Sequence, residues 1–208
     1  ESAAVSTDDT IFSFLTKPEN LRFALEVADY VGQLKRDMHK SFWTLYNTRM
    51  DERVKSSQYS RNWRYEGHPA ARYRKTWGKS YISPASDAEA GVPQLQLVFG
   101  QSTPDANYRL FWGVRWTTPP AEEFSHQALA TLATLLVNQG MTTVELPRYV
   151  RWGYTDYVPY SEGFLRRMYD DHDAFVNGIV DDVWSRFGEL RPLMEAVNAA
   201  RQKLERDQ

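Results

Sequence analysis

The sequence predicts an α+β fold: a small, mainly antiparallel sheet with a central hairpin at about 94–116, packed by long N-terminal and C-terminal helices. Three observations predict it. Apolar residues recur at three- and four-residue steps after Pro18 and again after Ser161, as in amphipathic helices. Between these regions, two stretches carry the alternating, branched and aromatic side chains of strands. The resulting order of helix, strands, helix, strand and helices is typical of α+β domains.

The first long helix is expected to run from Pro18 to about Asn47. Residues 1–9 are polar and are expected to form a frayed tail. Residues 51–80 have no clean period and contain glycine and proline, which indicates a loop with short strands. The apolar stripe that predicts the helix consists of Leu21, Leu25, Ala28, Val31, Leu34, Met38, Phe42 and Leu45.

The hairpin is the clearest local signal in the chain. Residues 94–100 alternate polar and apolar side chains before turning fully apolar, and residues 108–116 are rich in aromatic and branched ones. Residues 103–107 between them have good turn chemistry. On the second strand, the period of two places Arg109, Phe111 and Arg115 on one face.

The next two elements are a helix and a strand. Thr118 is expected to cap the helix, and Gly140 is expected to end it. A strand is predicted at 141–146, and Pro147 confines it to an edge or an end of the sheet.

The last third of the chain is expected to be helical after an irregular, partly extended aromatic stretch at 149–160. Ser161 is expected to cap a long helix that Gly188 breaks, with a final helix at 189–206. The sequence shows no internal repeat and no composition shift that marks a boundary. We therefore expect a single domain over 1–208.

Composition narrows the possible functions. The formal net charge is -2, so an electrostatic argument must be local. The chain has no cysteine, which excludes disulfides, thiolate metal sites and cysteine nucleophiles. No apolar run approaches the length of a membrane span. These features fit a cytoplasmic protein that does not bind membranes.

The strongest functional signal is a basic and aromatic segment between Arg53 and Tyr81, in which Glu66 is the one acid. Arginine and lysine neutralise phosphates, and aromatic faces stack on exposed bases. A second, sparser cluster at 147–157 repeats the pattern. The sequence therefore predicts a non-catalytic nucleic-acid-binding module, for DNA or RNA, without a cofactor. Its expected contact residues are Arg61, Trp63, Arg64, Arg72, Arg74, Lys75, Trp77, Lys79, Arg148 and Arg151.

Other interpretations of the same residues remain open. The segment also fits a solvated loop whose aromatic side chains cover the core and whose arginines pair with acids at 170–182. Arginine, tyrosine and tryptophan are equally typical anchors of a protein-interaction or regulatory domain. An enzyme that acts on a small anionic substrate is the third alternative.

Catalytic and metal motifs give no support to the enzyme alternative. The sequence has no zinc-protease, phosphate-loop or serine-nucleophile motif. The acidic run at 170–173 falls on a predicted helix, where adjacent side chains point about 100° apart and cannot converge on one ion. We therefore predict no catalytic or metal-binding residues.

Overall fold

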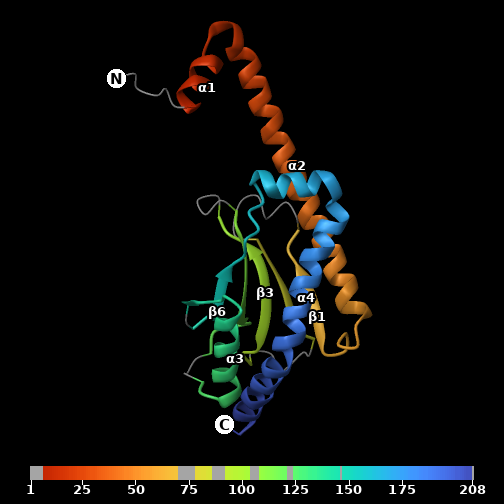
Figure 1. Ribbon diagram of the computed structural model, residues 1–208. Coiled ribbons are helices and arrows are strands. Elements are labelled where there is room, and N and C mark those ends of the chain that lie inside the picture. The colour runs from red at the N-terminus through yellow and green to blue at the C-terminus, as the bar shows by residue number, and fades with distance from the viewer. Residues whose placement is uncertain are drawn as a thin grey trace, which may run out of the picture. The chain divides into compact units, whose positions relative to one another are not determined.

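The computed structural model describes residues 7–69, 78–85, 92–103, 108–120, 124–145 and 147–207. None of the helices within these ranges has the length and hydrophobicity of a membrane span. The described helices and six-stranded antiparallel sheet confirm the predicted α+β class (Figure 1). In chain order the elements are α1 (Thr7–Leu15), α2 (Pro18–Ser56), β1 (Trp63–Gly67), β2 (Gly78–Pro84), β3 (Leu95–Gln101), β4 (Leu110–Trp116), α3 (Gln127–Asn138), β5 (Thr143–Glu145), β6 (Tyr149–Tyr154) and α4 (Glu162–Arg206).

The chain divides into two compact units, 1–38 and 39–208, and α2 contributes to both. The buried residues of α2 begin at His39 and continue to Val54. The earlier part of the predicted stripe is exposed at Leu21, Leu25 and Leu34. An apolar period predicts a helix face that needs covering, but it does not say which element covers it.

The sheet has the strand order β1-β2-β3-β4-β6-β5, so the predicted hairpin β3–β4 lies at its centre. The hairpin is confirmed, with Leu97 paired to Val114 and Phe99 paired to Trp112. The predicted edge strand is also confirmed, as the short strand β5.

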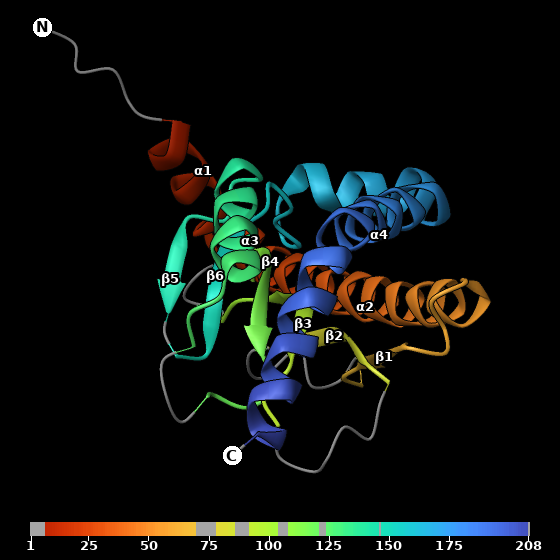
Figure 2. The ribbon, with the colours of Figure 1, turned by 90° about the horizontal axis from the view of Figure 1, so that it is seen from below.

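The helices of the second unit pack on one face of this sheet, which we call the core face (Figures 1 and 2). From α2, the rings of Trp43 and Tyr46 lie 5.8 and 4.8 Å from the ring of Phe99. From α4, Asn198 hydrogen-bonds the backbone N–H of Leu95 through its Oδ1 at 2.6 Å. Aromatic rings bury large apolar areas, so these contacts contribute much of the hydrophobic stabilisation of the sheet.

Several predicted boundaries are wrong. The first long helix continues to Ser56, past the expected end near Asn47, whereas the short strands expected within 51–80 are present as β1 and the start of β2. Helix α3 begins at Gln127 with His126 as its cap, later than the expected start at Thr118. The stretch expected to be irregular and partly extended contains β6, whose pairing with β4 supplies backbone hydrogen bonds that local sequence does not indicate.

Helix α4 also differs from its prediction. The cap at Ser161 is confirmed: its Oγ accepts a hydrogen bond from the N–H of Phe164 at 3.3 Å. The helix continues through Gly188 and is interrupted at Asp171, whose φ of -158° and ψ of 82° are not helical. A helical glycine costs about 0.5–1 kcal/mol, and the buried neighbours Phe187 and Leu190 offset that cost. The predicted end of α3 at Gly140 is confirmed by its φ of 85°.

Candidate nucleic-acid interface

The side of the sheet opposite the core face carries polar, charged and aromatic side chains, and we call it the polar face. Cross-strand partners point to the same side of a sheet, so the register assigns its members. Lys79 pairs with Gly100 of β3, and Gly100 pairs with Phe111 of β4, so Lys79 and Phe111 lie on the same side. The polar face comprises Arg64, Glu66, Lys79, Tyr81, Ser83, Gln96, Val98, Phe111, Arg115, Glu145, Tyr149, Trp152 and Tyr154.

Cations from β2, β4 and the turn that precedes β6 converge at the centre of this face. The Nζ of Lys79 lies 5.3 Å from the centre of the Tyr149 ring. The guanidinium of Arg115 lies 5.5 Å from the same ring and 5.6 Å from the ring of Tyr81. Arg148 precedes Tyr149 and lines the same hollow as Lys79. Lys79, Arg115 and Arg148 form what we call the cationic cluster.

Burial and mutual repulsion set the electrostatics of this cluster. Burial, together with the charges of Arg115 and Arg148, lowers the pKa of Lys79 to about 8, and Glu145 opposes this effect. Neither Arg115 nor Arg148 forms an ion pair with a carboxylate of the described residues. Arg115 and Arg148 therefore contribute positive charge to this face that a bound anion would offset.

A small apolar layer supports the cationic cluster. Val98, Phe111 and Tyr149 are buried together, and Tyr81 and Trp152 pack partly buried against them. Burial raises the pKa of Tyr149 to about 12. Lys79 and Arg115 lie over this layer, against the ring of Tyr149.

Aromatic side chains continue from this layer toward the end of β6. The rings of Trp152 and Tyr154 lie 5.2 Å apart in an edge-to-face arrangement. The guanidinium of Arg109 lies 5.1 Å from the ring of Tyr154, and its Nε donates to the carbonyl of Thr155 at 2.8 Å. Tyr154 is exposed, so an incoming planar group can reach its ring.

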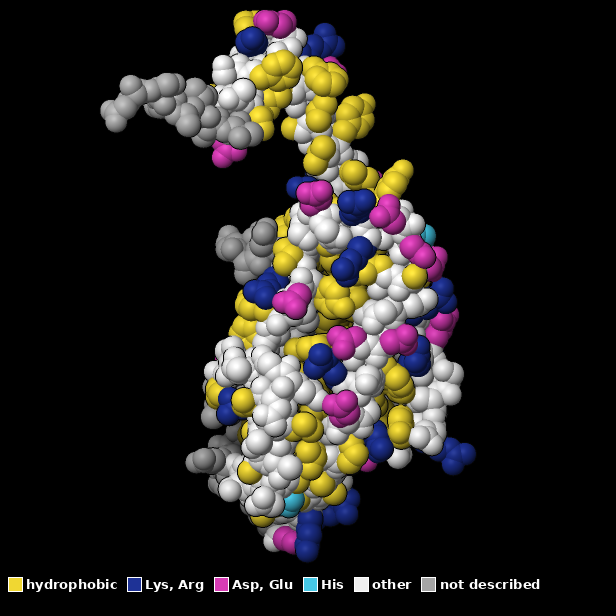
Figure 3. All heavy atoms as spheres, viewed as in Figure 1, with side chains coloured by type: hydrophobic (Ala, Val, Ile, Leu, Met, Phe, Trp, Pro, Cys, Tyr) yellow, Lys and Arg dark blue, Asp and Glu magenta, His cyan; other side chains and the backbone are white. Residues whose placement is uncertain are grey.

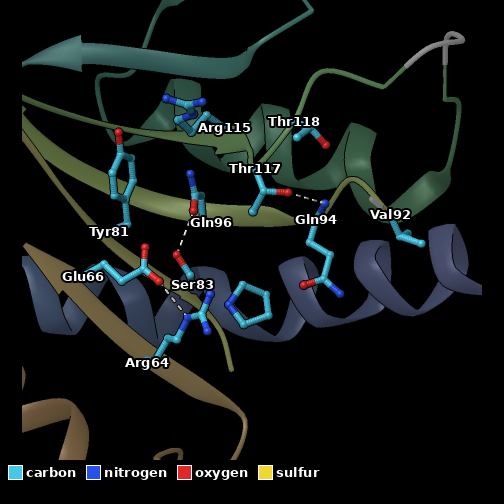
Figure 4. Close-up of a pocket in the computed structure, with 11 residues that line it drawn as sticks. Arg64, Glu66, Tyr81, Ser83, Val92, Gln94, Gln96, Arg115, Thr117 and Thr118 are labelled. Atoms are coloured by element: carbon cyan, nitrogen blue, oxygen red, sulfur yellow. Dashed lines mark hydrogen bonds and ion pairs between the residues drawn. The ribbon is translucent and has the colours of Figure 1, made fainter. Parts of the chain in front are cut away.

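Two hollows open on the polar face. One has a volume of about 330 Å³ and is lined by Lys79, Phe111, Glu145, Arg148, Tyr149 and Trp152. The other, of about 410 Å³, extends along the sheet from Arg64 and Tyr81 to Arg115 and Thr117 (Figure 4). In it, Ser83 donates a hydrogen bond to Oε1 of Gln96 at 2.7 Å. The first hollow is lined by cations and aromatic rings, and the second by hydrogen-bonding groups.

Gly113 makes room for the tryptophan of this face. A Cβ at position 113 would come within 2.6 Å of the Cβ of Trp152 and 2.7 Å of the carbonyl oxygen of Arg151. Close approach of this kind is a reason for glycine inside a strand. The absence of a side chain at Gly113 therefore positions Trp152 against the sheet.

The sequence-predicted contact residues separate into different environments. Arg72, Arg74, Lys75 and Trp77 lie outside the described residues. Trp63 is 2% exposed, and its Nε1 donates to Glu195 at 2.9 Å. Its ring packs edge-to-face on Phe187, 5.0 Å away, so Trp63 belongs to the core and presents no face to a base.

The arginines of the predicted segment lie in different surroundings. Arg53 pairs with Asp181 of α4, and Arg64 pairs with Glu66 at 2.8 Å. Arg61 is exposed and lines a separate hollow with Glu195. Arg53 and Trp63 therefore fit the alternative interpretation of this segment, in which arginines pair with acids and aromatic side chains cover the core.

Arg148 and Arg151 point to opposite sides of the sheet. Arg148 joins Lys79 on the polar face. Arg151 pairs with Val114, a core-face residue, and its Nη1 donates to the carbonyl of Thr142 at 3.3 Å. The alternation of side chains along β4 places Arg115 and Phe111 on one face, but it does not join them to Lys79, because that contact depends on strand order.

The described residues contain no group of three histidine, cysteine, aspartate or glutamate side chains that could hold a metal ion. The donors of the polar face are instead cations, amides and hydroxyls, which bind anions and hydrogen-bond acceptors. Comparisons with protein-family models, with curated proteins and with solved structures found no match to this chain.

Proposed function

We propose that this chain is a nucleic-acid-binding module, without catalytic activity of its own, that binds single strands on the polar face of its sheet. The observation that carries the proposal is the convergence of Lys79, Arg115 and Arg148 beside aromatic rings. The proposal retains Lys79 and Arg148 from the sequence-predicted residues, and it retains the cytoplasmic location expected from composition.

The charge of the cluster supports phosphate as the anion. Arginine presents a planar fork that matches two phosphate oxygens, and lysine adds a compact point charge. Lys79 lies partly buried beside two other cations, and its lowered pKa reflects a cost that a bound phosphate would offset. Glu145 also lines this hollow. Its negative charge repels phosphate, which limits how closely a bound nucleic-acid strand approaches β5.

The aromatic side chains favour a single strand over a duplex. Bases can stack on protein rings only when they are not already stacked in a double helix. Trp152 and Tyr154 lie beside the cationic cluster on the same face, so phosphates and bases of one strand have contacts within the same site. The hydrogen-bonding hollow near Gln96 and Arg115 lies next along the face.

Fluorescence anisotropy with labelled single-stranded DNA, single-stranded RNA and duplex DNA, over a series of salt concentrations, tests this proposal. We expect micromolar or tighter binding of single strands, weaker binding of the duplex, and a logarithmic salt slope of about -0.7 for each phosphate contact. Lys79→Ala combined with Arg148→Ala should weaken binding and flatten the slope. The matched control is Arg166→Ala, which removes an exposed cation on α4.

Three results would overturn the proposal. One is unchanged binding by the folded Lys79→Ala/Arg148→Ala variant. A second is that a mononucleotide displaces the bound strand completely and binds with the same affinity. That result would make the hollow beside Lys79 and Arg148 a site for a small anion. The third is the absence of any binding at low salt.

A further inference from the structure

The first unit of the chain exposes an unusual amount of apolar surface. In α1 and the first half of α2, eleven large hydrophobic side chains are exposed, among them Phe12 at 70%, Phe23 at 69% and Tyr30 at 77%. Figure 3 shows hydrophobic side chains gathered on this segment. Exposed patches of this size mark interaction sites.

The distribution of polar residues shows how much of the helix needs covering. Between Leu21 and Leu34 the polar side chains are Arg22, Glu26, Asp29 and Gln33, spaced by four, three and four residues. At about 100° per residue, these four fall within roughly 60° of the helix circumference. The remaining surface is apolar, which is typical of a helix buried on several sides.

The polar stripe satisfies itself within the helix. Arg22 pairs with Glu26 at 3.1 Å, and Nε2 of Gln33 donates to the carboxylate of Asp37 at 2.8 Å. The first pair neutralises two charges, and the carboxylates of Asp29 and Asp37 leave the stripe acidic. Over 7–38, acids outnumber lysine and arginine by six to four, whereas helices that lie on membranes are rich in lysine and arginine.

The exposed area is enough for a stable dimer. A large aromatic side chain has ~150–250 Å² to bury and an aliphatic one roughly 60–120 Å², so the eleven expose on the order of 900 Å² together. A standard stable interface buries about 800 Å² per partner. A second copy would supply two further apolar helices, whereas a single added helix covers one side.

We propose that residues 7–38 associate with the same segment of a second copy of this chain, around a two-fold axis. Such a contact places one self-complementary apolar surface against itself. Val27 and Val31 lie opposite the polar stripe on α2 and form the middle of the interface, while Arg22 and Gln33 remain in water. This association is independent of the proposed nucleic-acid interface, which belongs to the second unit.

Sedimentation velocity of the whole chain across micromolar concentrations tests the association. We expect twice the mass of the chain for the natural sequence and for the control Arg22→Glu/Gln33→Glu, which adds two acids to the polar stripe. Val27→Glu/Val31→Glu should give the mass of a single chain and leave the unfolding temperature of the second unit unchanged.

Other occupants of the surface give distinct results, and each overturns the proposal. A single-chain mass with amides of 21–34 protected from hydrogen exchange would mean that the chain covers the surface itself. Flotation of the natural chain with phosphatidylcholine vesicles, lost in Val27→Glu/Val31→Glu, would identify a membrane. A doubled mass that persists in Val27→Glu/Val31→Glu would place the interface elsewhere.

Discussion

The Nζ of Lys79 on β2 lies 5.3 Å from the ring centre of Tyr149 on β6, although β3 and β4 separate the two strands. Both side chains extend over the sheet and meet above its central strands, beside Arg115. The contact joins two segments that are distant in sequence and makes one site of them. It also places an ionisable lysine near two arginines, which gives the proposed interface a pH dependence.

Affinity for single strands should fall as the pH rises through about 8, the pKa of Lys79. The charged lysine contacts phosphate and the neutral one does not, and charge changes from about nine-tenths to about one-tenth between pH 7 and 9. We expect a loss on the order of ten-fold in affinity over this range. Binding titrations at constant ionic strength measure it.

Lys79→Arg is the control for this titration, because arginine keeps its charge throughout the range. The Lys79→Arg variant should bind with the same affinity at pH 7 and pH 9. If the variant loses affinity in parallel with the natural chain, another group is responsible for the pH effect.

The free energy of unfolding should rise with pH because of Lys79, whereas the affinity for single strands falls. Folded Lys79 loses its proton near pH 8, whereas the unfolded residue keeps it to about 10.5. Between these values the unfolded chain holds more protons, so the free energy of unfolding should rise with pH across this window. Lys79→Met should raise the melting temperature at pH 7 while weakening nucleic-acid binding. A Lys79→Met variant that melts at a lower temperature would contradict this account of the cluster.

The exposed ring of Tyr154 should contribute a stacking contact. Tyr154→Ala should weaken single-strand binding by about 1–3 kcal/mol, the usual value for one base on one aromatic side chain. Tyr169→Ala is the matched control, because Tyr169 is also exposed but lies on α4. Anisotropy titrations of both variants decide the point: equal affinities would remove Tyr154 from the interface.

The close packing of Trp152 against Gly113 should leave no room for a methyl group at position 113. A Cβ at Gly113 would lie 2.6 Å from the Cβ of Trp152, so Gly113→Ala should destabilise the fold by about 1–3 kcal/mol and disturb the aromatic part of the polar face. Denaturant unfolding measures the loss.

Gly178→Ala provides the comparison for that substitution. Gly178 lies inside α4, and a Cβ there would meet nothing within 4 Å. Alanine favours a helix over glycine, so this variant should be more stable by about 0.5–1 kcal/mol. Equal effects of the two substitutions would show that the close approach of Trp152 does not constrain position 113.

The local sequence determined the helices around Pro18 and Ser161, the hairpin at the centre of the sheet and the end of α3 at Gly140, because periodicity and turn chemistry act over a few residues. The tertiary structure alone decided the strand order that brings Lys79, Arg115 and Arg148 together. It also decided that Trp63 enters the core and that Arg151 turns away from Arg148. The physical reason is that backbone pairing and burial between distant segments select the partners of each side chain, and no local pattern contains that choice.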